Sequence, residues 1–309
     1  MQPKVAIVIL NYNSYKLTIN LLEELKSIEY ENISVIVVDN NSPNESYTYL
    51  KKYISGNNCN YETKLIKSEK NGGYSSGNNL GIKKAEKLNS KYVLIMNNDI
   101  HFKDYKVINN LVKKMENYDE IAATGPQILT ENGDIQLPLY EKEKFLNVFF
   151  KKLFNPLHLF MSRFQKDLVD KERYVYTLCG CFVMMRLKDI KKINFFDENI
   201  FFYGEEIIWG EKFEKINKKV LYVPGTIVYH EIGSTIQKFY DSSQIHEMVD
   251  KNMLYYYKKY REDIGIVKYS LLKFAFFIKR KVYHSVYTGI KNIENFKKKR
   301  RKAEFCRKK

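Results

Sequence analysis

Cysteine, proline and long apolar runs are scarce in this chain of 309 residues. Its four cysteines (Cys59, Cys179, Cys181 and Cys306) form neither a disulfide framework nor a paired C-x-x-C motif. Cys179 and Cys181, which flank one glycine, are more typical of buried packing than of a metal site. Because this cysteine usage suits a reducing compartment, we expect a cytoplasmic protein.

Long hydrophobic segments are missing as well. No stretch approaches the roughly 18 apolar residues that a membrane-spanning helix needs. The first apolar run, residues 5–10, is too short for the core of a signal peptide, so we expect none. The chain is instead rich in aromatic rings, with 25 Tyr and 19 Phe. Its length suits one large α/β domain with an extension.

Acidic residues are few at one end of the chain. Residues 258–309 hold 18 of the 52 basic residues but only 4 of the 36 acidic ones, so they carry +14 of the net +16. Residues 1–257 are therefore close to neutral. The sequence predicts a body over residues 1–257, with a first half at 1–125 and a second half at 126–257, and a basic amphipathic extension at 258–309.

Apolar runs alternate with helical periodicity through the first hundred residues. Strands are predicted at residues 5–10, 34–38, 64–67 and 92–96, with helices at 17–28, 46–53 and 80–88 between them. Further on, the pattern predicts a helix at 107–117 and strands at 121–124, 174–186 and 220–230, with an irregular insertion over 130–171. This alternation predicts an α/β fold with a mostly parallel central sheet flanked by helices.

Polar residues stand where the predicted strands end. Residues 97–99 (NND) follow the strand at 92–96, and Asp39 follows the strand at 34–38. Ligands of open α/β sheets bind beyond the carboxyl ends of their strands, and a carboxylate there suits Mg²⁺ or Mn²⁺ beside a phosphate. The alternative is a plain turn, since Asn and Asp are common where strands end.

Residues 71–79 (NGGYSSGNN) are predicted to form a Gly-rich loop, whose backbone N–H groups can approach a phosphate closely. This loop is not a G-x-x-x-x-G-K-[ST] motif, and no G-x-G-x-x-G motif follows the first strand. ATP-type and dinucleotide-binding functions are therefore disfavoured.

Six segments together resemble the inverting family 2 glycosyltransferases, and most of all their rhamnosyltransferase-like branch in bacterial surface polysaccharide synthesis. They are residues 5–13 (VAIVILNYN), 37–42 (VVDNNS), 71–79 (NGGYSSGNN), 96–99 (MNND), 195–206 (FFDENIFFYGEE) and 229–234 (YHEIGS). The resemblance covers roughly residues 4–235. It implies a GT-A fold, in which a Rossmann-like nucleotide-binding sheet is joined to an acceptor-binding half.

The resemblance also implies the roles of individual residues. Tyr12 would stack on the nucleotide base, Asp39 would contact the base or ribose, and Asp99 with His230 would hold Mg²⁺ or Mn²⁺ at the diphosphate. The implied nucleotide-sugar site comprises Asn11, Tyr12, Asp39, Asn71, Gly72, Asn78, Asn98 and Asp99. Asn98 stands where the family commonly has a second carboxylate, which reduces the negative charge of the site.

The general base of an inverting transfer is expected in Gly204-Glu205-Glu206. The family places it at the second acid, so we assign Glu206 as the base and Glu205 to orienting the acceptor or the loop. Adjacent carboxylates also raise each other's pKa. The alternative is a solvated acidic turn. Ile208 and Lys212 occupy positions where relatives often have an acid and an arginine.

The sequence therefore predicts an enzyme that moves a sugar from a nucleotide-diphosphate donor, dTDP- or UDP-linked, to a glycan or lipid-linked acceptor. The alternatives are a nucleotidyltransferase and a GT-A binding module without activity. The tail, with apolar residues 271–278 between basic clusters, favours an anionic membrane surface over nucleic acid or plain solvation. We expect a protein peripheral to the inner face of the cell membrane, and no nucleic-acid partner.

Overall fold

A computed structural model describes residues 2–56, 60–153, 169–231 and 240–281. The chain divides into two compact units, one made of Met1–Lys142 with Gln165–Tyr256 and the other of Glu143–Phe164 with Tyr257–Lys309. The boundaries expected from the sequence, after residues 125 and 257, stay predictions. Several sequence features lie outside the described residues: Cys59 and Cys306, part of the 130–171 insertion, residues 232–234 of the last family motif, and residues 282–309 of the basic extension, with the cluster at 297–302.

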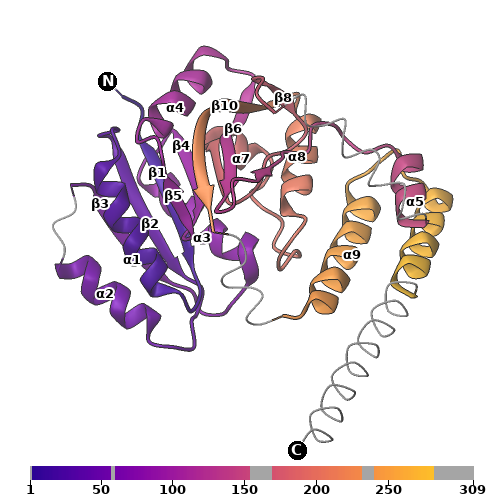
Figure 1. Ribbon diagram of the computed structural model, residues 1–309, viewed down its shortest axis with the longest axis horizontal. Helices are drawn as coiled ribbons and strands as arrows, with labels where there is room; N and C mark the ends of the chain where they lie inside the picture. Colours follow the sequence, from indigo (N-terminus) through magenta and orange to yellow (C-terminus); the bar gives the residue numbers. More distant parts are fainter. Residues whose placement is uncertain (1, 57–59, 154–168, 232–239, 282–309) are drawn as a thin grey trace, which may run out of the picture. The chain divides into compact units, whose positions relative to one another are not determined.

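The first unit is built on one mixed sheet with the strand order β3-β2-β1-β4-β9-β6-β10-β5, while β7 pairs with β6 and β8 with β10 (Figure 1). The strands are β1 (Val5–Asn11), β2 (Ile33–Asp39), β3 (Glu62–Lys67), β4 (Tyr92–Asn97), β5 (Ile100–Phe102), β6 (Ile121–Thr130), β7 (Ile135–Gln136), β8 (Arg173–Val175), β9 (Phe182–Arg186) and β10 (Lys219–His230). The helices are α1 (Tyr15–Glu24), α2 (Ser46–Gly56), α3 (Gly73–Lys87), α4 (Val107–Asn117), α7 (Leu187–Lys192), α8 (Glu205–Lys215) and α9 (Ser242–Lys259).

Strands β3, β2, β1 and β4 are mutually parallel, as are β6 and β10. Strand β9 lies antiparallel between β4 and β6, and β5 is antiparallel to β10. The predicted α/β fold with a mostly parallel sheet and flanking helices is confirmed. Short β5, between residues 97–99 and the helix at 107–117, is not evident from the sequence pattern.

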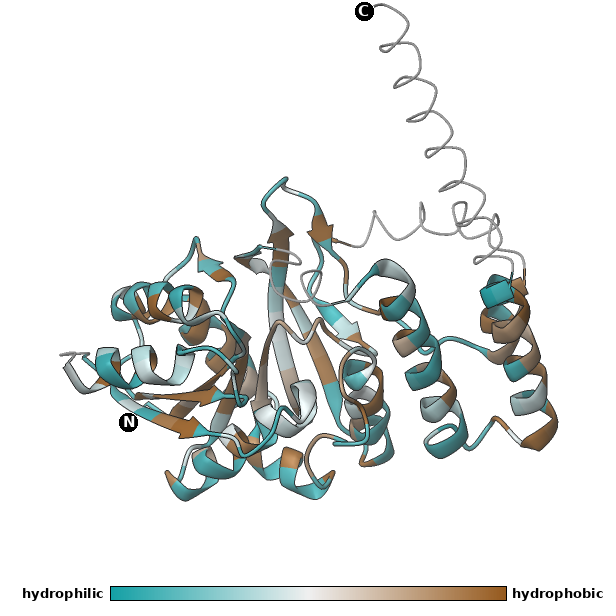
Figure 2. Ribbon diagram, turned by 90° about the horizontal axis from the view of Figure 1, so that it is seen from below, coloured by the Kyte–Doolittle hydropathy of each residue, from teal (hydrophilic) through white to brown (hydrophobic). Residues whose placement is uncertain are grey.

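Both faces of the central strands are buried. On β1, Val5, Ile7 and Ile9 pack with α1, α2 and α4, whereas Ala6 and Val8 face the opposite cluster, which includes side chains of α3, α7 and α8. Since successive strand residues point to opposite faces, such a strand reads as one continuous apolar run. Figure 2 shows the result, with mostly brown strands covered by helices that mix brown and teal.

The predicted loop over residues 71–79 is wrong from Gly73 onward, because α3 already begins there. Two glycines of α3 allow close packing. A Cβ on Gly77 would lie 2.4 Å from Leu10 Cδ1, and a Cβ on Gly81 would lie 2.3 Å from Val8 Cγ1. Without side chains at these two positions, α3 can lie directly on β1. The strand predicted at 174–186 is also corrected, since β8 and β9 are separate strands.

The second unit contains α5 (Phe145–Leu153) and a helical segment over residues 266–281. Leu272, Ala275 and Phe276 of that segment are buried. Among the described residues, no helix combines the length and the hydrophobicity needed to cross a bilayer.

Candidate active site

Asp39, at the end of β2, is fully buried and held by its neighbours. Its Oδ2 accepts hydrogen bonds from Asn11 Nδ2 at 2.8 Å and from Ser42 Oγ at 2.7 Å, and its Oδ1 accepts one from the Ser42 N–H at 3.0 Å. Asn11, at the end of the neighbouring parallel strand β1, is equally buried. In this structure Asn11 therefore fixes the orientation of the Asp39 carboxylate.

Asn98 belongs to the same network, and its amide explains the departure from an acidic pair. Its Nδ2 donates to Ser14 Oγ at 2.8 Å and to Thr18 Oγ1 at 2.9 Å. Both hydroxyls in turn donate to Asn11 Oδ1, at 3.5 Å and 2.9 Å. In this arrangement the two hydroxyls accept hydrogen bonds from position 98, which an amide can donate and an ionised carboxylate cannot.

The structure brings Asp99 and His230 together, although 130 residues of chain separate them. The antiparallel register of β5 and β10 pairs His230 with Ile100, and the N–H of Glu231 donates to Asp99 O at 3.0 Å. As a result, His230 Nε2 lies 3.1 Å from Asp99 Oδ1. Burial opposes the charged imidazole, but the adjacent Asp99 carboxylate outweighs it, so the pKa of His230 is raised.

Gln136, on β7, orients this histidine, and sequence reasoning missed it. His230 Nδ1 lies 3.1 Å from Gln136 Oε1. With Nδ1 carrying the proton that is donated to the amide oxygen, Nε2 is left as the nitrogen that faces Asp99. Outer hydrogen bonds of this kind fix the tautomer of a metal-binding histidine. Gln136 lies inside the irregular 130–171 stretch, where no periodic signal marks it.

The pair is suited to a divalent cation. Asp99 Oδ1 is buried, and no other hydrogen-bond donor among the described residues reaches it. A carboxylate oxygen next to an imidazole nitrogen is acceptable to Mn²⁺ and tolerable for Mg²⁺. The described residues contain no group of three or more His, Cys, Asp or Glu side chains that could hold a metal. Asp99 and His230 would therefore need oxygen ligands from a bound diphosphate or from water.

The segment Cys179-Gly180-Cys181 joins this pair to the predicted base. Cys179 Sγ lies 3.4 Å from Cys181 Sγ, and each sulfur lies 3.8 Å from Gln136 Oε1. The Gly180 N–H donates to Glu206 Oε1 at 3.3 Å. The charges of Glu206 and His230 act on the pKa of the Cys179 thiol, and those of Asp99 and Glu206 act on the pKa of the Cys181 thiol. Acid, imidazole and predicted base are thus grouped around one short segment.

Glu205 and Glu206 form the first turn of α8. Burial raises the pKa of Glu206, although the N–H groups of Gly180 and Gly204 partly oppose this rise. Burial and then the charge of Glu206 raise the pKa of Glu205 well above its usual value, and Glu205 Oε2 has no hydrogen-bond partner among the described residues. The solvated acidic turn considered from the sequence does not describe this pair, because Glu205 is buried and Glu206 is partly buried.

The backbone before α8 is held in an uncommon conformation. Tyr203 has φ +67° and Gly204 has φ +96°. Asn252, from α9, donates from Nδ2 to Phe202 O and to Tyr203 O, both at 2.8 Å. These two bonds satisfy the carbonyls of a segment that can make no regular ladder, and they fix the point at which α8 begins.

The start of α3 contacts the same segment. Gly73 has φ +80°, and a Cβ there would lie 2.1 Å from Phe201 O. The N–H of Tyr74 donates to that oxygen at 2.8 Å, and Tyr74 Oη donates to Gly180 O at 2.5 Å. The glycine thereby lets the expected nucleotide side of the site meet the loop that leads to Glu206.

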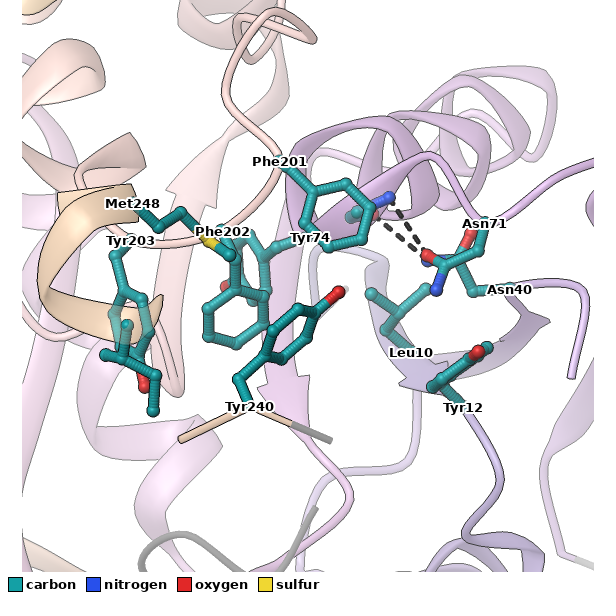
Figure 3. Close-up of a pocket in the computed structure, with 12 residues that line it drawn as sticks. Leu10, Tyr12, Asn40, Asn71, Tyr74, Phe201, Phe202, Tyr203, Tyr240 and Met248 are labelled. Carbon is teal, nitrogen blue, oxygen red and sulfur yellow. Dashed lines mark hydrogen bonds between the residues drawn. The ribbon is translucent and has the colours of Figure 1, made fainter. Parts of the chain in front are cut away.

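A cleft of about 140 Å³ opens beside this contact (Figure 3). One side is aromatic and the other carries the amides of Asn40 and Asn71, with Asn40 Nδ2 donating to Asn71 Oδ1 at 2.9 Å. Its lining residues are Leu10, Tyr12, Asn40, Asn71, Gly73, Tyr74, Phe201, Phe202, Tyr203, Tyr240, Ile245 and Met248.

Of the expected nucleotide-site residues, Tyr12 and Asn71 line the cleft. Gly72 immediately precedes α3 and lies tight against Ser76, since a Cβ on Gly72 would lie 2.6 Å from Ser76 Cβ. Asn78 is buried inside α3, where its Nδ2 donates to Tyr74 O at 3.0 Å. Tyr240, whose ring points into the cleft in Figure 3, was not expected from the sequence.

The fold and this edge of the sheet agree with what family comparison finds. The model of the family described as "Glycosyl transferase family 2" matches residues 6–193, more than half of the chain. The chain therefore belongs to glycosyl transferase family 2.

A curated relative is the low-salt glycan biosynthesis hexosyltransferase Agl10 of Haloferax volcanii. It is 27% identical over 210 residues, which make up 67% of this chain and 60% of the relative. The chain thus spans less than two thirds of that protein's length.

Solved structures share the fold. TarS 1-349 of S. aureus in complex with UDP-GlcNAc has a TM-score of 0.56 and 17% identity over 89% of this chain and 72% of that one. GalNAc-T7 with UDP, GalNAc and Mn²⁺ has a TM-score of 0.62 and 14% identity over 84% of this chain and 49% of that one. The mannosyltransferase PcManGT of Pyrobaculum calidifontis with GDP-Man and Mn²⁺ has a TM-score of 0.58 and 11% identity over 93% of this chain and 76% of that one. The expected GT-A fold is confirmed.

Proposed function

We propose that this chain transfers a hexose, with inversion at the anomeric carbon, from a nucleotide-diphosphate sugar to a glycan or lipid-linked acceptor. The observation that carries this proposal is the grouping of Asp99, His230 and Glu206 around Cys179-Gly180-Cys181. A proton acceptor and a cation-binding pair at one sheet edge are the two elements that such a transfer needs.

The nucleotide is proposed to occupy the aromatic cleft. The ring of Tyr12 offers a stacking surface for the base, and Asn71 and Asn40 offer amide groups for hydrogen bonding. The structural neighbours were solved with UDP, UDP-GlcNAc and GDP-Man, which supports a nucleotide-sugar donor. UDP- and dTDP-linked hexoses, including rhamnose, are the donors that we propose to test first.

The chain's own groups would divide the chemistry as follows. Asp99 and His230 would hold Mg²⁺ or Mn²⁺, which supplies charge stabilisation to the leaving diphosphate. Glu206 accepts the proton of the acceptor hydroxyl while that oxygen forms its bond to the anomeric carbon and the bond to the diphosphate breaks. The raised pKa of Glu206, caused by burial, brings this carboxylate closer to the pH at which a base works best.

The family and the charge distribution support a proposal for the acceptor and for the place of reaction. We propose a surface polysaccharide intermediate of bacterial type as acceptor, at the cytoplasmic face of the cell membrane. Relatedness to a glycan biosynthesis hexosyltransferase supports the acceptor class. The basic extension supports the location, because it would meet anionic lipid there.

The test is a panel of nucleotide sugars scored by release of the nucleoside diphosphate. Glu206→Gln is expected to reduce kcat by roughly 10²–10⁴-fold, the usual contribution of a general base, with donor binding retained. Glu214→Gln, on the exposed side of the same helix, is the matched control and should leave kcat unchanged. Undiminished turnover in Glu206→Gln would remove the base assignment. Full activity in excess EDTA would refute the proposed need for a metal. Donor binding without any turnover in the wild type would identify a binding module.

A further inference from the structure

The two units expose different kinds of hydrophobic side chain. In the first unit, the large hydrophobic residues at the surface are Tyr49, Tyr105, Tyr118, Ile135 and Tyr174. In the second unit they are Leu146, Phe150, Ile266, Val267, Leu271, Phe274 and Phe277. A tyrosine presents a hydroxyl to water, whereas the side chains of the second unit have no polar atom to present. The second unit therefore has an apolar surface that water solvates poorly.

Five of these side chains form one stripe on the helix at 266–281. The stripe recurs at helical spacing, with positions 267, 271 and 274 four and three residues apart. We call these five residues the apolar stripe: Ile266, Val267, Leu271, Phe274 and Phe277. Ile266 is 87% exposed and Phe274 is 56% exposed. Brown residues recur along the helices of this unit in Figure 2.

The stripe is a second apolar face, because the helix already uses another for packing. Leu272, Ala275 and Phe276 are buried, and the Phe276 ring lies 6.5 Å from the Tyr257 ring. Lys152 Nζ lies 4.5 Å from the centre of the Phe276 ring and Lys268 Nζ lies 5.8 Å from that of Phe145, which places α5 beside this helix. Packing among the described residues of the unit thus leaves the apolar stripe 42–87% exposed.

Positive charge borders most of the apolar stripe, although Glu262 and Asp263 precede the helix and Lys151 is paired with Glu143. Residues 264–281 contain Lys268, Lys273, Lys279, Arg280 and Lys281 and no acidic residue. Helix α5 likewise carries Lys151 and Lys152 and no acidic residue. An apolar face bordered by lysine and arginine is the pattern of a helix that lies in the plane of a membrane interface.

We propose that the apolar stripe enters the interface of an anionic lipid bilayer, with the surrounding basic residues at the level of the lipid headgroups. The rings and aliphatic side chains would lie at the boundary between headgroups and acyl chains, and the cations would pair with the anionic headgroups. This proposal identifies the surface that would bind the membrane, and it rests on the proposed function only for the location of the protein.

A second copy of the chain fits this surface less well. Pairing two apolar stripes across a two-fold axis would bring two mostly basic borders together, and like charges repel at such a contact. Nucleic acid would use the same cations but leave the apolar stripe in water. Anionic lipid is the partner that satisfies both features.

The experiment is flotation of the full chain with vesicles of phosphatidylcholine alone or with 30% phosphatidylglycerol, a composition of about one anionic lipid in three. We expect binding to the anionic vesicles. A salt concentration of 1 M should weaken this binding, because the Debye length shortens to about 3 Å. Phe274→Ser/Phe277→Ser removes two exposed rings without opening the core and should weaken partitioning at least tenfold. Tyr105→Ser/Tyr118→Ser, in the first unit, is the matched control and should float like the wild type.

A charge variant tests the other half of the proposal. Lys273→Gln/Lys281→Gln should weaken binding to anionic vesicles roughly 25-fold, at about fivefold per lysine near a charged surface. Equal flotation of the Phe274→Ser/Phe277→Ser variant and the wild type overturns the proposal, as does equal binding to neutral and anionic vesicles. So does a wild type that stays off vesicles and sediments as a dimer where the double serine variant is a monomer. Because flotation needs neither donor nor acceptor, its outcome is separate from that of the transfer assay.

Discussion

Replacing Gly73 by alanine tests whether the start of α3 must meet the loop before α8. The backbone at this position has φ +80°, and the new Cβ would lie 2.1 Å from Phe201 O, a backbone atom that cannot rotate away. Gly133 provides a matched control, since it has the same φ of +80° but no atom within 4 Å of the Cβ that alanine would add. The two variants share backbone strain and differ in the steric contact.

The expected magnitudes follow from these geometries. A side chain in the left-handed region costs about 1–2 kcal/mol, reduced by the roughly 0.4–1 kcal/mol by which alanine restricts the unfolded chain. Gly73→Ala adds overpacking of about 1–3 kcal/mol and strains the Tyr74 N–H to Phe201 O bond, which contributes about 0.5–1.5 kcal/mol. Gly73→Ala should therefore be less stable than Gly133→Ala by roughly 1.5–4.5 kcal/mol.

The measurement is urea unfolding followed by the fluorescence of Trp209. This is the only tryptophan in the chain, it is 1% exposed, and it lies on α8 in the first unit. It therefore reports the unit in which both glycines lie. Equal losses of stability in the two variants would refute the steric contact between Gly73 and Phe201.

Two further predictions concern Gln136, which sequence reasoning missed, and Glu205, whose burial only the structure shows. Gln136→Leu removes the acceptor for His230 Nδ1 and should raise the Mn²⁺ concentration needed for half-maximal transfer about 10–100-fold. Gln136→Glu restores an acceptor. Equal Mn²⁺ dependence in the wild type and both variants would contradict a positioning role. Glu205→Gln should raise the thermal midpoint at pH 8 and change it little at pH 4. The reason is that the pKa of Glu205 is raised by burial and by Glu206, so above the usual 4.5 the unfolded chain releases a proton that the native state retains, and stability falls as pH rises. The same change in midpoint at both pH values would contradict this.

Much of the sheet could be predicted because its signals are local. The runs that became β1, β2 and β4 are apolar on successive residues, and a strand buried on both faces requires that pattern. The polar residues at their ends followed from the rule that parallel strands end at one edge. The resemblance to family 2 added Glu206 and His230, which no periodicity marks.

The errors have an equally local cause. Gly72, Gly73 and Gly77 signal a loop when they are read as neighbours along the chain. In the structure two of them answer to distant atoms, since Gly73 faces Phe201 O and Gly77 faces Leu10. A short-range rule cannot anticipate a glycine that is required by a residue more than a hundred positions away.

By itself, the sequence determined the α/β class, the strands whose ends form the candidate site, the candidate acid, base and histidine, and the concentration of basic charge in the last 52 residues. Only the tertiary structure decided how these groups are held. The register of β5 and β10 placed His230 beside Asp99, and the fold made the Asn98 amide a donor to the hydroxyls of Ser14 and Thr18. Hydrogen-bond direction, tautomer and burial depend on which side chains meet in space, and one-dimensional spacing does not record those meetings.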